Sequence, residues 1–289
     1  MTTLVAPSSP TVLPDGLPIS LVEALADGRL VPYLGPGVLA LAADYAVPST
    51  TEALVDKLTA KSAVPHKIRK RLTQSAQYIE NFKHRKTLVG LMNEAFAAPP
   101  RPAHLHAALA RHGFPLIVDA WYGDAMGAAL AEALGDEAWG RVQGLAQSEH
   151  FGTWTGWYDA AGQPVPDPQP GWRSILYQPI GAHAPAGNYL VSDTDYVEVL
   201  TEIDIQTPIP AEVQRLRSGR SFLFVGCRFN DQLPRAFARQ IMKRSSGCHW
   251  AVLPDEPTRM EARFLAEQGI ARIAMPLEAF APALMSYLA

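Results

Sequence analysis

The chain has 289 residues, of which 48% are hydrophobic and 18% are charged, and its formal net charge at pH 7 is −3. This composition supplies enough apolar material for one large domain, or for a core with a smaller lobe. The near-neutral charge argues against nucleic acid or an anionic membrane as a specific partner. Two cysteines, Cys227 and Cys248, form no C-x-x-C pair. We therefore expect reduced structural thiols, with neither a disulfide scaffold nor a metal site.

The N-terminus has neither the basic region nor the unbroken apolar stretch of a signal peptide. No segment approaches the ~20 consecutive apolar residues of a membrane-spanning helix. The sequence therefore predicts a cytoplasmic protein without a membrane partner. Residues 1–17 are rich in Pro, Ser and Thr, and we expect them to form a flexible N-terminal arm before a single domain at 18–289.

The first part of that domain is predicted to hold two buried strands with a helical insert between them. A short helix precedes the apolar run at 30–34, which is typical of a buried strand and leads directly into a Gly-Pro-Gly turn. Apolar residues then recur at helical spacing through the insert, at about 50–112. The second core strand is expected at 115–119, where another apolar run ends in Asp119.

A basic segment at 67–86 lies inside the helical insert. Its cations are Lys67, Arg69, Lys70, Arg71, Lys83, Arg85 and Lys86. We expect this segment to be helical and exposed, because a charge run of this kind is usually a solvated helical face. The alternative is a docking surface for an acidic protein partner.

The second part of the chain predicts a small β-rich excursion, followed by alternating strands and helices. Strand-like alternation and a D-A-A-G turn indicate the excursion at about 139–173, and a core strand is expected at 174–180. The apolar runs at 221–226, 249–253 and 270–275 indicate buried strands, each followed by a helix after a short link. This alternation predicts an α/β fold with a doubly wound parallel sheet.

The turn after the first strand is the first candidate for a ligand contact. Gly35 and Gly37 lack side chains, so the backbone there could approach a pyrophosphate and point amide N–H groups at it. The segment is not a complete G-x-G-x-x-G motif, and Pro36 has no N–H to donate. A tight turn between a strand and a loop is the alternative interpretation.

Five segments of the chain, in this order, share the pattern of one protein family. They are LVPYLGPGVLALAADYAVPSTTEALVDKL, PAHLHAALARHGFPLIVDAWYGD, YQPIGAHAPAGNYLVSDTDYVEVL, FLFVGCRFNDQLPRAFARQI and CHWAVLPDEPTRMEARFLAEQGI. Together they resemble the SIR2-like family, the bacterial relatives of sirtuins. The resemblance implies a Rossmann-like fold with a site for NAD or another nucleotide that contains ADP-ribose. It also implies a set of cofactor-binding positions: Gly35, Pro36, Gly37, Val38, Trp121, Tyr122, Gly181, Gly226, Asn230 and Asp231.

The sequence departs from the family pattern where that family carries out its NAD-consuming chemistry. The Asn of the family's Thr-Thr-Asn-Tyr-Asp motif falls on Trp121, and the Asp of that motif falls on Gly123. The His of its Lys-Leu-His-Gly motif falls on Ile180, and the Ser of its glycine loop falls on Leu39. An isoleucine cannot act as a base, and a tryptophan cannot hold a catalytic water as asparagine does. The sequence therefore predicts a pseudoenzyme that binds a nucleotide or a protein partner without deacylase activity.

An NAD-consuming hydrolase is the alternative function. Asp119, or Asp124 shortly after it, could stabilise the oxocarbenium-like centre that forms when the nicotinamide bond breaks. His183 lies three residues beyond Ile180, and its side chain need not enter the cleft. The two acids could equally be ordinary polar residues that close a strand.

Overall fold

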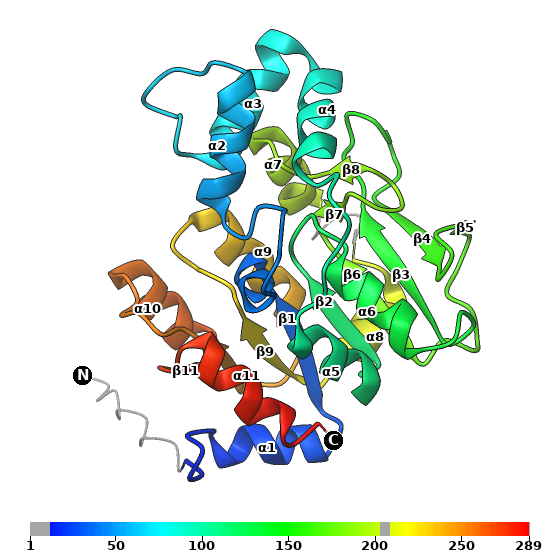
Figure 1. Ribbon diagram of the computed structural model, residues 1–289, viewed down its shortest axis with the longest axis vertical. Helices are drawn as coiled ribbons and strands as arrows, with labels where there is room; N and C mark the ends of the chain where they lie inside the picture. The colour runs from blue at the N-terminus through cyan, green and yellow to red at the C-terminus, as the bar shows by residue number, and fades with distance from the viewer. Residues whose placement is uncertain (1–11, 203–208, 289) are drawn as a thin grey trace.

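The computed structural model describes residues 12–202 and 209–288; residues 1–11, 203–208 and 289 lie outside this description. Its core is a nine-stranded mixed sheet with the order β11-β10-β9-β1-β2-β6-β3-β4-β5 (Figure 1). The strands are β1 (Leu30–Leu34), β2 (Leu116–Asp119), β3 (Trp139–Gly144), β4 (Thr155–Asp159), β5 (Pro164–Val165), β6 (Ser174–Gln178), β9 (Ser221–Val225), β10 (His249–Val252) and β11 (Ile270–Ile273). A separate small sheet pairs β7 (Gly181–Ala182) with β8 (Asn188–Tyr189).

The central part of the sheet is parallel. Every pairing from β11 through to β3 is parallel, whereas β4 and β5 extend the sheet as antiparallel strands. The prediction of an α/β, Rossmann-like fold with a mostly parallel sheet is therefore confirmed. One element differs from expectation. The sequence placed 139–144 in a β-rich excursion, but this segment is β3, a core strand that is buried along its length and pairs in parallel with β6.

Helices cover both faces of the sheet (Figure 1). One hydrophobic cluster joins the sheet to α1 (Ile19–Ala26), α5 (His104–His112), α6 (Ala125–Ala133) and α11 (Leu277–Met285). The other joins it to α2 (Thr51–Lys61), α3 (Leu72–Lys83), α4 (Arg85–Ala95), α7 (Asp193–Glu202), α8 (Ala211–Arg217), α9 (Gln232–Met242) and α10 (Arg259–Glu267). Alternate residues of β1 supply the two clusters, as the two-residue period of a strand requires. A short 3₁₀ helix, η1 (Pro36–Leu41), follows β1.

The basic segment at 67–86 is not one exposed helix. Four of its cations lie in an exposed turn ahead of α3: Lys67, Arg69, Lys70 and Arg71. Arg85, at the start of α4, has a side chain that is only 13% exposed. It binds the carboxylates of Asp195 at 2.9 Å and Glu149 at 3.2 Å. Arg85 therefore belongs to the interior of the fold, not to a docking surface.

Part of the expected N-terminal arm packs against the domain. Leu17 is fully buried, and the Asp15 carboxylate accepts a hydrogen bond of 2.8 Å from the hydroxyl of Tyr287. The rest of the arm, residues 1–11, lies outside the described residues. Within 12–202 and 209–288, no helix is long and apolar enough to cross a membrane.

A buried ion pair fixes α6 against β3. The Arg141 guanidinium of β3 donates a hydrogen bond of 2.6 Å to the Asp124 carboxylate at the start of α6. Gly127, in the first turn of α6, makes room for this pair. A Cβ atom there would lie 2.2 Å from Asp124 Oδ1 and 2.9 Å from the Arg141 guanidinium. The absence of a side chain at this position thus permits the ion pair.

We expect Gly127→Ala to lower the free energy of unfolding by about 1–3 kcal/mol, because the added methyl must displace a buried ion pair. Gly90→Ala, in α4, is the matched control because a Cβ there meets nothing within 4 Å. This control should raise stability by about 0.5–1 kcal/mol, as expected for an unstrained helical Gly→Ala change. Urea unfolding of both variants measures the difference, and equal effects would contradict the assigned role of Gly127.

Candidate functional site

A cavity opens where the order of the parallel strands reverses. From β1 the chain proceeds to β2 on one side and later returns to β9 on the other side. Open α/β sheets bind ligands at such a switch point, beyond the carboxyl ends of the strands. The cavity here has a volume of about 330 Å³. Its walls include 35–37 after β1, 120–122 after β2 and 226–231 after β9.

The glycine loop packs directly on the backbone that follows β9. Gly35 N donates to Val225 O at 2.9 Å, and Gly37 N donates to Gly226 O at 3.0 Å. Val38 N donates to Gly35 O at 3.3 Å, and Pro36 has no N–H. A Cβ on Gly35 would lie 2.5 Å from Gly226 O. The glycines are therefore needed for close backbone packing, and the amides of 35–38 already have partners within the protein.

Aromatic residues form the wall after β2. The Trp121 indole donates a hydrogen bond of 2.7 Å to Pro48 O, and its ring packs against Phe96. The Tyr122 hydroxyl donates at 2.7 Å to Leu190 O. Ile180 lines the same cavity, whereas no histidine does so among the described residues. The cavity consequently has an apolar wall at the positions where the resemblance implies Asn and His.

Asp119 and Asp124 do not line this cavity. The alternation along β2 directs Asp119 to the face of Ile117, toward α6. Burial raises the pKa of the Asp119 carboxyl well above its usual range, and the nearby Asp124 contributes to the rise. Burial also raises the pKa of Asp124, although its ion pair with Arg141 opposes that change. Both acids lie among buried polar groups behind the cavity wall.

Two further predicted site residues, Gly181 and Val38, and the nearby His183 have structural roles of their own. His183 Nδ1 lies 3.1 Å from the Tyr189 hydroxyl, and the ring does not line the cavity. Gly181 has a φ of +75°, and a Cβ there would lie 2.1 Å from Asn188 O, so it serves the β7–β8 pairing. Val38 is fully buried in the cluster beside α5 and α6. The remaining predicted binding residues meet in the cavity: Gly35, Pro36, Gly37, Trp121, Tyr122, Gly226, Asn230 and Asp231.

A family model described as SIR2-like domain matches residues 115–273, more than half of the chain. The chain belongs to this SIR2-like family. The resemblance inferred from the sequence is therefore confirmed. The matched stretch includes the walls after β2 and β9 but not the glycine loop or α2–α5. No curated protein matches the chain.

Sequence reasoning missed a polar side of the SIR2-like cavity. The residues concerned are Ser49, Thr50, Thr51 and Glu52 at the start of α2, and Lys70, Arg71, Leu72 and Thr73 at the start of α3. Two signals in the sequence could have indicated them. Thr50 is a typical N-cap, with its hydroxyl accepting from Ala53 N at 3.0 Å. The basic segment supplies the cations, but only the fold brings it to the cavity.

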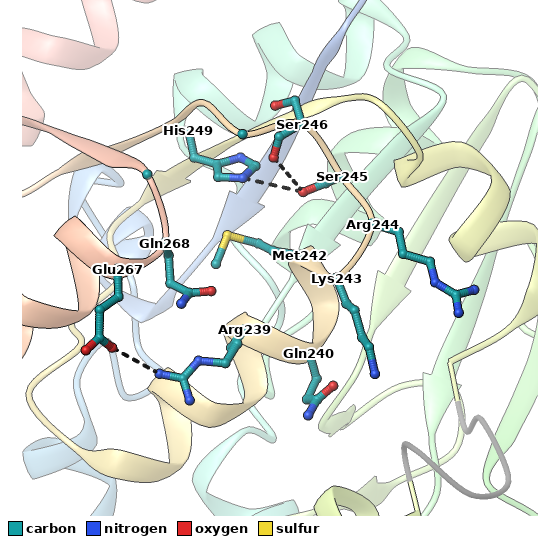
Figure 2. A pocket seen from close by; sticks show the side chains of 12 residues that line it. Arg239, Gln240, Met242, Lys243, Arg244, Ser245, Ser246, His249, Glu267 and Gln268 are labelled. Carbon is teal, nitrogen blue, oxygen red and sulfur yellow. Dashed lines mark hydrogen bonds and ion pairs between the residues drawn. The ribbon is translucent and has the colours of Figure 1, made fainter.

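A second cavity lies at the other end of the strands, beside the amino ends of β10 and β11. It has a volume of about 500 Å³ and none of the predicted site residues. Its charged side chains do not converge. Arg239 points toward Glu267, 3.7 Å away, whereas Lys243 and Arg244 extend in other directions (Figure 2). Burial lowers the pKa of His249 to about 4, so its ring is neutral at pH 7. This hollow shows no organised site.

The raised pKa of Asp119 predicts how the stability of Asp119→Asn depends on pH. Below the ordinary pKa of an aspartate the carboxyl is neutral in both the folded and the unfolded state, so the variant and the wild type should be similarly stable. As the pH rises from that ordinary pKa toward the raised folded-state pKa, the unfolded wild type releases a proton that the folded wild type retains, so the wild type loses stability. The melting temperature of the variant should therefore exceed that of the wild type by an amount that grows over this pH range. A difference in melting temperature between the variant and the wild type that becomes smaller with rising pH would contradict this prediction.

Proposed function

We propose that this SIR2-like protein binds NAD or another nucleotide that contains ADP-ribose in the switch-point cavity, and that it acts by binding without deacylase activity. The observation that supports this most directly is the convergence of three strand-end segments, 35–37, 120–122 and 226–231, on one cavity. At about 330 Å³ the cavity lies at the lower end of typical ligand-pocket volumes, roughly 300–1,000 Å³. Membership of the SIR2-like family supports NAD-related chemistry as the ligand class.

The residues present fit nucleotide binding better than catalysis. Trp121 and Tyr122 line the cavity with buried, mutually packed rings, which suits an apolar contact with a base or a nicotinamide ring. Deacylation needs a base near the ribose, and Ile180 stands where the resemblance implies that base. NAD hydrolysis by Asp119 or Asp124 would require an acid at the cavity, and both carboxyls lie behind its wall. This geometry supports the binding function over the hydrolase alternative.

The cellular setting of this function is part of the same proposal. A cytoplasmic, bacterial protein fits the sequence pattern, and an acidic partner could still meet the exposed cations of the basic segment. Because Arg85 is buried and Lys70 and Arg71 line the cavity, that surface reduces to four side chains: Lys67, Arg69, Lys83 and Lys86.

Addition of ADP-ribose or NAD should raise the melting temperature of the protein. A ligand that binds only the folded state stabilises it by about 2.7 kcal/mol at 100 times its dissociation constant. Differential scanning fluorimetry over a series of ligand concentrations measures the rise. A melting temperature that does not change at millimolar concentrations of either nucleotide would contradict the proposed binding function.

The purified protein should release neither an acyl group from acyl-lysine peptides nor nicotinamide from NAD. The reason is that, among the described residues, no histidine lines the cavity and neither Asp119 nor Asp124 does so. Mass spectrometry of the peptide and chromatography of the nicotinamide, each against a heat-killed control, measure the two reactions. Release of nicotinamide that is lost in Asp119→Asn or Asp124→Asn would establish the hydrolase instead. Release that survives both changes would assign catalysis to other residues.

A further inference from the structure

We propose that the helical insert, not the glycine loop, holds the phosphate groups of the ligand in this cavity, through Lys70, Arg71 and Ser49. This inference rests on the proposed nucleotide-binding function and names the side of the cavity that recognises the charged part of the ligand. The chemistry it recognises is a pyrophosphate, whether from a dinucleotide or from a nucleoside diphosphate.

The first argument is that the glycine loop has no amides to spare. The N–H groups of Gly35, Gly37 and Val38 all donate to backbone carbonyls within the protein, at 2.9–3.3 Å. Pro36 has none. A phosphate placed on this loop would have to break one of these hydrogen bonds before gaining another, so the loop can form an apolar floor but not a phosphate cradle.

The second argument is the charge on the opposite side. Lys70 and Arg71 line the cavity, are exposed, and make no ion pair or side-chain hydrogen bond with any other described residue. The third cation of the cavity, Arg228, is held by Glu261 and Asp255, each at 3.3 Å. Lys70 and Arg71 are therefore the cations that remain available to an anionic ligand. Charge-assisted hydrogen bonds to phosphate are stronger than neutral ones.

Two carboxylates also line the cavity, and each lies at the start of a helix. Asp231 caps α9 by accepting a hydrogen bond of 3.2 Å from Leu233 N. Glu52 lies in the first turn of α2, where the helix dipole favours a negative charge. Three helices in fact begin at this cavity, since 49–52, 70–73 and 230–231 precede or open α2, α3 and α9. Of these, α3 begins without a side-chain cap at Arg71.

The third argument is a hydroxyl at the cavity without a protein partner. Ser49 is 6% exposed and lines the cavity, and its hydroxyl has no hydrogen bond to any other described residue. This hydroxyl is therefore available to a ligand in the cavity. A phosphate oxygen between the start of α2 and the start of α3 would accept from Ser49 while pairing with Lys70 and Arg71.

The test compares two pairs of substitutions in the same exposed turn. Lys70→Ser with Arg71→Ser removes the cations that line the cavity, and Lys67→Ser with Arg69→Ser removes the same charge just outside it. Serine also suits the N-cap position of α3 that Arg71 occupies, so both variants should fold and melt near the wild type. Titration calorimetry with ADP-ribose, ADP and adenosine then measures binding.

We expect the Lys70/Arg71 variant to bind ADP-ribose and ADP about 10–100-fold more weakly, as the loss of charged hydrogen bonds predicts. The Lys67/Arg69 variant should stay within about twofold of the wild type, the difference expected for exposed charges away from the ligand. Adenosine, which has no phosphate, should bind all three proteins equally. Ser49→Ala should weaken only the two phosphate-bearing ligands.

Three outcomes would overturn the inference. Unchanged binding of ADP-ribose by the Lys70/Arg71 variant would assign the phosphates elsewhere, while the proposed function would stand. Equal losses in both variants would indicate a general effect of charge, not a site. Failure of the wild type to bind ADP-ribose, ADP and adenosine would end the proposed function, and this inference with it.

Discussion

The backbone contact between β1 and β9 is the constraint on which the site depends. Gly35 and Gly226 approach so closely that a side chain at either would collide with the other loop, and Gly226 has a φ of +68°. This contact brings the two strand ends together at the switch point and thereby defines the cavity floor. It also engages the loop amides that a phosphate would otherwise use. One packing requirement thus creates the cavity and restricts what its floor can bind.

A second constraint removes the acids from the cavity. β2 is buried on both faces, so consecutive residues at its end must face opposite sides of the sheet. Asp119 shares the side of Ile117, where Arg141 and Asp124 form a buried pair below α6. A buried cation needs a partner, because isolating it costs several kcal/mol. Asp124 therefore holds α6 to the sheet, and Asp119 lies buried near this pair.

The sequence predicted the fold better than the site, for identifiable reasons. Short apolar runs separated by helices specify a parallel sheet, and the second half of the chain shows that pattern clearly. The alternation of side chains along a strand could have placed Asp119 on the face of Ile117. No local sequence pattern, however, shows that the backbone amides of 35–38 already donate hydrogen bonds within the protein. Lys70 and Arg71 are far from the strand ends in sequence, and the contact with the cavity exists only in three dimensions. Val38 and Gly181 do not line the cavity, and a family motif by itself does not distinguish packing from ligand contact.

Trp121, which stands where the family has Asn, connects the helical insert to the cavity. Its indole reaches Pro48, just before α2, and its ring packs on Phe96 at the end of α4. The position that would hold a catalytic water in a sirtuin here fixes the helical insert to the end of β2. Since α2 and α3 begin at the cavity, the same contact positions their amino ends there. Trp121 is 5% exposed, so its side chain is part of the packing that keeps the cavity in shape.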